Sequence, residues 1–142
     1  MSIGYGGRRL AAFVDVLVRE NIDVLIDVRL RAVSAIPGFS GVALGRAVAA
    51  AGIEYRHASP LGNPQDNRAP FHEGPLEAGL VRFRELLAGG PAHDALEELA
   101  TMARQRRVAV LCAERDHARC HRQVIIEQAQ KLSPGVAVTV LT

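Results

Sequence analysis

The sequence predicts an α/β protein, a single three-layer domain over residues 1–142 with a mainly parallel sheet of about five strands and helices on both faces. Short apolar runs rich in β-branched residues alternate with segments whose apolar residues recur at helical spacing, which is the pattern of βαβ units. The runs at 24–26 and 108–111 are apolar throughout, as expected for strands that helices cover on both sides. A length of 142 residues favours one domain.

The first part of the chain supplies three predicted strands and two helices. A short strand begins at Ile3 and breaks into a glycine turn. A helix is predicted over 9–20 because its apolar residues fall on one face. A β-branched strand at 23–29 ends in charged residues, and a helix over 42–51 then leads to a third strand at 53–57.

The second part opens with a stretch, 58–75, that is rich in Pro, Gly and Asn and is predicted as a long irregular loop. Long loops inside compact domains often carry function. The elements that follow are predicted in the order helix, helix, strand, helix and strand, at 76–87, 93–104, 107–112, 117–132 and 136–141.

Composition excludes several classes of protein. The net charge of +2, from 17 basic and 15 acidic residues, is too balanced to indicate nucleic-acid binding by itself. Two cysteines are too few for a disulfide scaffold. The first residues lack the pattern of a signal peptide, and no apolar run has the length of a membrane span. We therefore expect a cytoplasmic protein with reduced thiols and no membrane contact; its oligomeric state is not predicted.

Both cysteines fall in residues 112–122, between a predicted buried strand and the start of a helix. We call these residues the motif segment. Ligands of parallel α/β sheets bind at the carboxyl ends of the strands, so residues that follow different strands are expected to meet there. The candidate catalytic residues are Asp27, Cys112, Glu114 and His121. The candidate ligand-binding residues are Tyr5, Gly6, Gly7, Arg8, Arg29, Arg115, Cys120 and Arg122.

Several fragments, in order along nearly the whole chain, resemble one family. They are Ile3-Gly4-Tyr5-Gly6-Gly7-Arg8, Ile26-Asp27-Val28-Arg29, Pro37-Gly38-Phe39-Ser40, Gly52-Ile53-Glu54-Tyr55-Arg56-His57, Leu61-Gly62 and Cys112-Ala113-Glu114-Arg115 with Cys120-His121-Arg122. The sequence thus resembles the domain of unknown function 488 family. The resemblance implies an α/β protein of a mainly bacterial or archaeal family without assigned activity. The chain departs from that family at Asn63-Pro64, where members often carry a second glycine followed by aromatics.

The preferred functional hypothesis is an enzyme or ligand-binding domain for an anionic ligand of phosphate or nucleotide type, or for a nucleic-acid end. Arg115, Arg119 and Arg122 lie in the motif segment, and arginine forks suit phosphate. The competing hypothesis is a non-enzymatic binding domain in which Glu114 and Asp116 pair with these arginines, so that the motif is structural.

Thiol chemistry is an alternative, because a cysteine at a strand end facing a helix N-terminus can be a thiolate. The strand Ile26-Asp27-Val28-Arg29 followed by a later strand-end cysteine is also similar to rhodanese-like sulfurtransferases. However, the segment between Cys112 and Arg119 has no glycine and carries two carboxylates, which would repel an oxyanion and raise the pKa of a thiol. His121 is the candidate for proton transfer.

Metal binding and a redox disulfide are further alternatives. Cys112, His117, Cys120 and His121 offer ligands suited to zinc, with His57 or Asp27 needed to complete the set. The two cysteines lie eight positions apart, unlike the close pairs of structural zinc sites. We therefore expect no metal and no cofactor. A Cys112–Cys120 disulfide remains possible if the loop brings the thiols together, although no Cys-x-x-Cys is present.

Overall fold

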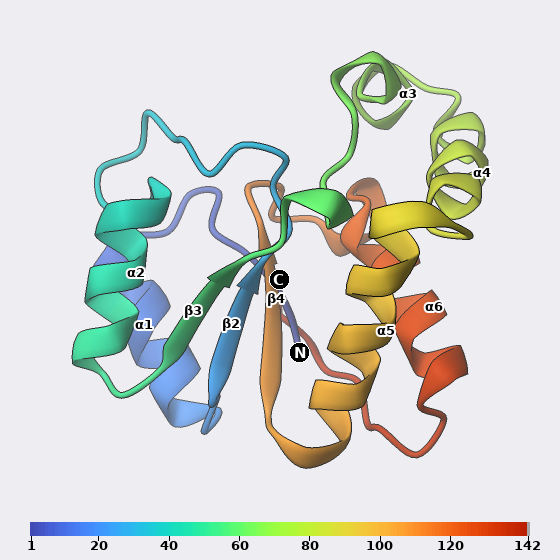
Figure 1. Ribbon diagram of the computed structural model, residues 1–142. Coiled ribbons are helices and arrows are strands. Elements are labelled where there is room, and N and C mark those ends of the chain that lie inside the picture. Colours follow the sequence, from blue (N-terminus) through green and yellow to red (C-terminus); the bar gives the residue numbers. More distant parts are fainter. Residues whose placement is uncertain (142) are drawn as a thin grey trace.

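The computed structural model describes residues 1–141 and contains a five-stranded, fully parallel sheet, which confirms the predicted fold class (Figure 1). The strand order is β3-β2-β4-β1-β5. In chain order the strands are β1 (Ser2–Gly4), β2 (Val24–Asp27), β3 (Glu54–His57), β4 (Val108–Cys112) and β5 (Val140–Leu141).

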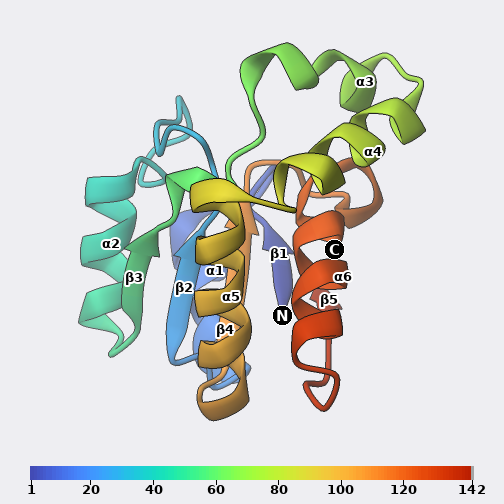
Figure 2. The same cartoon turned by 45° about the vertical axis from the view of Figure 1, so that its right-hand side comes forward.

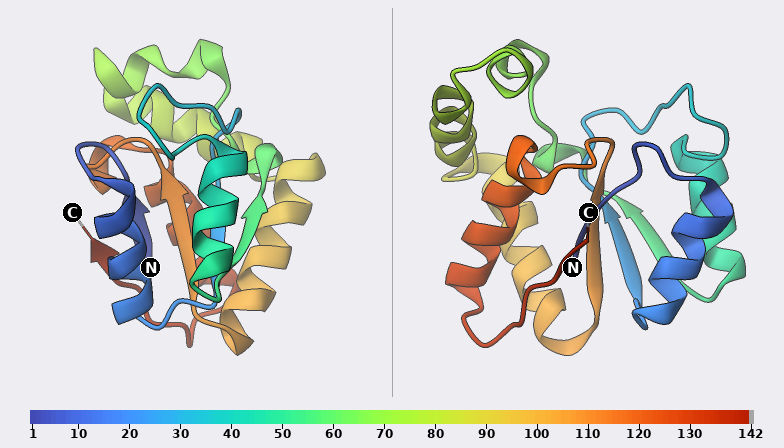
Figure 3. Two further views of the ribbon diagram at one scale, coloured as in Figure 1. Left: turned by 90° about the vertical axis from the view of Figure 1, so that its left-hand side faces the viewer. Right: turned by 180° about the vertical axis from the view of Figure 1, so that it is seen from behind.

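Helices cover both faces of this sheet (Figure 3). One layer holds α1 (Leu10–Arg19) and α2 (Gly41–Ala50), and the opposite layer holds α5 (Gly90–Gln105) and α6 (Arg122–Leu132). The remaining helices, α3 (Ala69–His72) and α4 (Leu76–Leu86), lie on the side of the carboxyl ends of the strands, with α3 above the layer of α5 and α6 (Figure 2).

The apolar residues of the central strands divide between two cores. On β2, Val24 and Ile26 pack with the layer of α4, α5 and α6, whereas Leu25 packs with the layer of α1 and α2. Successive side chains of a strand point to opposite faces, so a strand covered on both sides must be apolar at every position. This is why the sequence pattern identified the buried strands.

The register of the sheet brings the carboxyl ends of three strands level. Gly4 of β1 pairs with Cys112 of β4, and Asp27 of β2 pairs with Leu111 of β4. Residues that follow these strands therefore share one edge, as the sequence predicted from parallel topology.

Four elements differ from their sequence-based predictions. The 58–75 stretch is not irregular, because it contains two short 3₁₀-helices and α3. Helix α5 begins at Gly90, three residues early, since Pro91 fits the first turn where no N–H partner is needed. The last strand shortens to Val140–Leu141.

The predicted helix over 117–132 is interrupted. Residues His117–Arg119 form a 3₁₀-helix whose start is capped by Asp116, which accepts from the N–H of Ala118 at 3.0 Å. Cys120 then has extended backbone, and α6 begins at Arg122. Cys120 is thus not on the first turn of the helix, where the spacing predicts it, but directly in front of it.

Candidate active site

A pocket of about 380 Å³ opens at the carboxyl edge of the sheet. Three parts of the chain form it: the segment after β2, the residues around the 3₁₀-helix at Gln65–Asn67 together with α3, and the motif segment. Its walls include Tyr5, Arg29, Arg31, Asn63, Arg68, Phe71, His72, Cys112, Glu114, Arg119, Cys120 and His121. A second cavity of about 340 Å³ is lined in part by Met1 and Arg107. No cysteine or histidine lines it, so the pocket at the carboxyl edge is the candidate active site.

Both thiols and one imidazole meet in the wall of this pocket. The sulfur atoms of Cys112 and Cys120 and a ring nitrogen of His121 all lie within 4.8 Å of one another. Cys112 ends β4, whereas the other two residues immediately precede α6. The cluster is largely shielded: the exposed fractions are 9% for Cys112, 1% for Cys120 and 6% for His121.

The imidazole of His121 is fixed by contacts on two sides. Its Nε2 lies 2.9 Å from the carbonyl oxygen of Val28, which can only accept, so Nε2 carries a proton. Its Nδ1 lies 3.6 Å from the sulfur of Cys120. The ring also packs edge-on against Phe83, at 5.1 Å between ring centroids. Nδ1 is therefore the ring nitrogen that faces the sulfur of Cys120, while Nε2 is held by the backbone.

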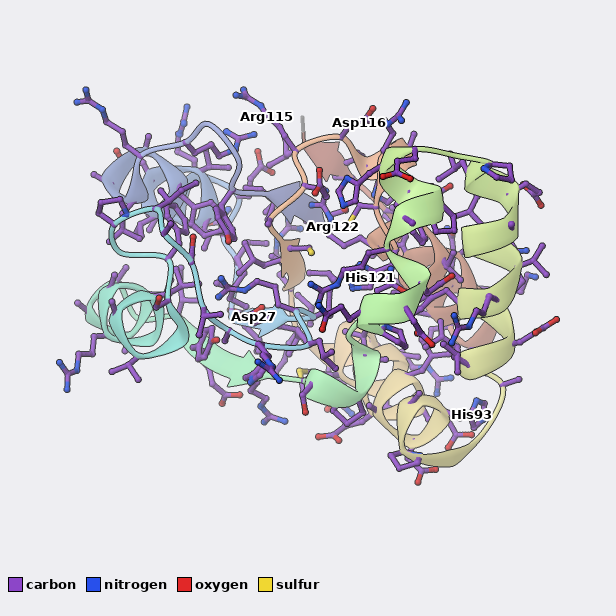
Figure 4. All side chains as sticks on the ribbon, turned by 90° about the horizontal axis from the view of Figure 1, so that it is seen from above. Asp27, His93, Arg115, Asp116, His121 and Arg122 are labelled. Atoms are coloured by element: carbon purple, nitrogen blue, oxygen red, sulfur yellow. The ribbon has the colours of Figure 1, made fainter. Side chains whose placement is uncertain are left out.

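Arg122 is fully buried, with an exposed fraction of 0%. Its Nε donates to the sulfur of Cys120 at 3.4 Å, and its Nη2 donates to the backbone oxygen of Glu114 at 2.5 Å. Within residues 1–141 no carboxylate lies at ion-pair distance from it, and its Nη1 makes no hydrogen bond. Figure 4 shows Arg122 and His121 beside each other at this edge, with His93 far from them.

A buried guanidinium needs a counter-charge, because an isolated charge in a low-dielectric interior is very costly. The sulfur of Cys120 is the group placed to supply it. Burial raises the pKa of the Cys120 thiol, but hydrogen bonds from Cys112 and His121 and the charges of His121 and Arg122 outweigh burial and bring that pKa well below its ordinary value. Cys120 also precedes the N-terminus of α6, where a thiolate is favoured.

Cys112 behaves in the opposite way. Its hydrogen bond to Cys120, together with burial, raises the pKa of the Cys112 thiol well above its ordinary value. The two thiols are therefore unequal: their surroundings lower the pKa of Cys120 and raise the pKa of Cys112. The loop carboxylates do not cause this, although the sequence suggested that they would: Glu114 and Asp116 are exposed, and Asp116 caps the 3₁₀-helix.

Asp27, predicted as catalytic, is fully buried behind the pocket and does not line it. Its carboxylate accepts from Arg29 Nε at 2.9 Å and Nη2 at 2.6 Å, and from the hydroxyl of Tyr55 at 2.6 Å. Burial lowers the pKa of Arg29, but Asp27 and Tyr5 outweigh burial and raise it above its usual range. Asp27 therefore fixes Arg29, which does reach the pocket wall.

Three arginines of the pocket carry no partner for their guanidinium groups. Arg31, Arg68 and Arg119 line the pocket, are exposed, and form no ion pair or side-chain hydrogen bond with any described residue. The carboxylate of Glu114 lies 3.9 Å from His72 instead. The rim of the pocket therefore has a surplus of positive charge, which suits an anion.

The glycine turn after β1 supports the motif segment and does not line the pocket. The N–H of Gly6 donates to the oxygen of Ala113 at 2.9 Å. A Cβ atom on Gly4 would stand 1.9 Å from the oxygen of Glu114, so only glycine allows the motif segment to pass here. Arg8 bonds the oxygen of Gly4 at 2.9 Å.

The structure therefore brings six of the candidate residues to the pocket: Tyr5, Arg29, Cys112, Glu114, Cys120 and His121. Six do not line it: Gly6, Gly7, Arg8, Asp27, Arg115 and Arg122. Sequence reasoning missed Arg31, Arg68 and His72: Arg31 follows β2, whereas Arg68 and His72 belong to the start and end of the four-residue helix α3, which is too short to show a periodic pattern. A strand-end position is the only signal that could have pointed to Arg31.

Cys112, Cys120 and His121 are the residues that could hold a metal ion, since their ligand atoms converge and Nε2 of His121 is bonded to a carbonyl, as in zinc sites. The charge balance fits poorly. The guanidinium of Arg122 already neutralises one thiolate, so a divalent cation would add charge beside a buried cation.

Comparison with known proteins found one family. The family model described as "Domain of unknown function DUF488" matches residues 9–129. Neither the search of curated proteins nor that of solved structures found a match. No helix in the described part of the chain is long and apolar enough to cross a membrane.

Proposed function

Because the chain belongs to the family of domain of unknown function DUF488, whose description names no activity, we propose a function from the site itself: a thiol-dependent enzyme for a small anionic substrate of phosphate or nucleotide type. In this proposal Cys120 is the nucleophile, His121 is the proton carrier, and the rim arginines Arg31, Arg68 and Arg119 hold the anion.

One observation carries the proposal. Arg122 is a completely buried cation whose nearest anionic partner is a cysteine sulfur, and that sulfur lines a pocket with three unpaired arginines on its rim. A packing cysteine needs no guanidinium donor, since free cysteine is normally a small buried hydrophobe. A thiolate in an electropositive pocket is the usual environment of a nucleophilic cysteine.

The proposed reaction follows from the positions of these groups. Nδ1 of His121 accepts the proton of Cys120, while Nε2 stays bonded to Val28. The thiolate forms a bond to the electrophilic atom of the substrate, and the bond from that atom to its leaving group breaks. The imidazolium then gives its proton to the leaving group. A second acceptor afterwards releases the group from the sulfur.

A non-enzymatic anion-binding domain is the second candidate. The low exposure of Cys120, 1%, favours it, because a substrate must reach the sulfur for covalent chemistry. In that case the arginine rim would still bind the ligand, and the thiolate would serve only as the counter-charge of Arg122.

Two alkylating reagents separate these possibilities. Iodoacetate is anionic and iodoacetamide is neutral, so the ratio of their rates at Cys120, read by mass spectrometry, reports anion binding and thiolate reactivity together. We expect this ratio to be higher in the native protein than in the unfolded chain. It should fall several-fold when Arg31, Arg68 and Arg119 are replaced by alanine.

Arg46→Ala is the matched control, since Arg46 is an exposed arginine on α2, away from the pocket. It should leave the ratio unchanged. An unchanged ratio in the triple variant would reject anion binding by the rim. If Cys120 is alkylated only upon global unfolding, the enzymatic proposal fails and the binding domain remains.

A further inference from the structure

Two thiols from different elements lie within reach of each other. Cys112 ends a rigid central strand, whereas Cys120 lies in the extended residue before α6. Their sulfurs lie within 4.8 Å of each other, and both line the same wall as the imidazole of His121. Nucleophilic attack uses only one of these two thiols, so the presence of the second beside it requires a separate explanation.

We propose that Cys112 is the resolving thiol of Cys120, and that the pair reduces a two-electron oxidant of the peroxide class and closes to a disulfide. This inference rests on the proposed function of Cys120 as the nucleophile. It assigns to Cys112 the role of the second acceptor that releases the sulfur-bound group.

Both steps conserve atoms and electrons. The thiolate of Cys120 attacks the distal oxygen of the hydroperoxide, the O–O bond breaks, and a sulfenic acid forms on the sulfur. The departing alkoxide takes the proton held by His121 and leaves as an alcohol. The sulfur of Cys112 then displaces the hydroxyl of the sulfenic acid, which leaves as water with the Cys112 proton. The protein loses two hydrogens and the peroxide gains two electrons.

The geometry permits the second step. The sulfurs must close from their present separation to about 2.05 Å, a movement within reach of side-chain rotation at one or both residues. Residues 113–119 between them pack against the glycine turn through Gly6 and Ala113, so the motif segment holds both thiols at one wall of the pocket.

Arg122 determines which state is favoured. In the reduced state its Nε bonds the Cys120 sulfur, which bears the charge that balances this buried cation. In the disulfide that charge is gone and the guanidinium is left uncompensated. Stabilising the reduced thiolate makes a disulfide more oxidising, so this bond is expected to be catalytic and easily reduced, unlike a structural disulfide.

The test treats the reduced protein with one equivalent of hydrogen peroxide, followed by intact mass and non-reducing peptide mapping. Wild type is expected to lose two hydrogens and to yield a peptide pair joined at Cys112 and Cys120. Cys112→Ser should stop at the sulfenic acid, trapped by dimedone on Cys120. Cys120→Ser should react far more slowly and form no linked peptides.

The failures can be told apart. If wild type accumulates sulfenic or sulfinic acid on Cys120 without a disulfide, or forms only intermolecular disulfides, Cys112 is not a resolving thiol, although Cys120 remains a nucleophile. If Cys120 is not oxidised before unfolding, the proposed function fails as well. If the serine variant does not fold, the trapping experiment is repeated with Cys112→Ala. The wild-type peptide map shows by itself whether Cys112 and Cys120 become linked, without either variant.

Discussion

At the scale of single residues, the guanidinium of Arg122 has the largest effect on the site. It is buried without a carboxylate among the described residues and donates to the sulfur of Cys120. The sequence placed Arg122 among the ligand-binding candidates, whereas its position is behind the pocket wall. Its effect on a ligand is indirect, through the charge on that sulfur.

Arg122→Met should raise the pKa of Cys120, because it removes a cation that stabilises the thiolate. Hydrogen bonds to charged groups contribute about 1.5–3 kcal/mol, so the rise in the pKa of Cys120 should be measurable. The measurement is the midpoint of Cys120 alkylation by iodoacetamide against pH. In wild type this midpoint should lie below that of a free thiol, with Cys112 unlabelled over the same range.

Three groups from the surrounding elements act on that midpoint: Cys112 on β4, and His121 and Arg122 at the start of α6. Arg122→Lys keeps the charge and should move the midpoint less than the methionine variant does. An equal shift in the two variants would indicate that the arginine acts through packing and not through its charge.

At the scale of elements, β2 and the segment after it form the rigid side of the pocket. Asp27 joins Arg29 to Tyr55 on β3, and Arg29 reaches Tyr5 with Nη1 at 3.2 Å. Tyr5 in turn stacks on Phe39, with ring centroids 4.5 Å apart. Three parts of the chain are therefore locked at the carboxyl edge by one buried ion pair.

Asp27→Asn should destabilise the protein by about 3–5 kcal/mol, because it leaves the guanidinium of Arg29 buried without a compensating charge. The free energy of unfolding is measured by urea denaturation. The double variant Asp27→Asn with Arg29→Met should recover part of the loss. If the single variant costs less than about 1 kcal/mol, water or another group already balances this arginine and the proposed lock is wrong.

Gly4→Ala should be destabilising by about 1–3 kcal/mol or more, because the added Cβ would lie 1.9 Å from the backbone oxygen of Glu114. Gly89→Ala is the matched control: a Cβ there meets nothing within 4 Å, and its φ of −159° is ordinary extended backbone. Urea denaturation of both variants makes the comparison. Equal free energies of unfolding for the two variants would mean that the motif segment moves away from Gly4 without cost, which would contradict its close packing against β1.

At the scale of the whole molecule, topology concentrates the polar chemistry at one end. The strand order β3-β2-β4-β1-β5 places β2 and β1 on either side of β4, so residues after all three surround the motif segment. The helices bury both faces of the sheet and leave its carboxyl edge, under α3, as the place where thiols, imidazole and arginines meet.

The purified protein is expected to hold no stoichiometric zinc. Cys112, Cys120 and His121 converge, but a divalent ion beside the buried Arg122 would meet a site whose single thiolate is already neutralised. Elemental analysis measures the metal, and thermal unfolding with and without a chelator measures its effect on stability. About one zinc per chain, with a lower melting temperature in chelator, would make these three residues ligands and replace the thiolate account.

The sequence by itself determined the fold class and the region of the site. Runs that are apolar at every position require helices on both sides, and a polar segment after such a run must lie at a strand end. Those two local patterns predicted that Asp27, Arg29, Cys112 and His121 meet around one cleft; three of them line the pocket, and Asp27 lies behind it.

Only the tertiary structure decided which group does what. The pKa is lowered at Cys120 and raised at Cys112, Asp27 holds Arg29 in position, and Arg31, Arg68 and His72 line the pocket. Burial, and the direction in which a side chain points from an irregular segment, depend on contacts between residues far apart in the chain. Arg122 meets Cys120 because helix α6 starts at Arg122, five residues later than its periodicity indicates, and no local pattern encodes that start.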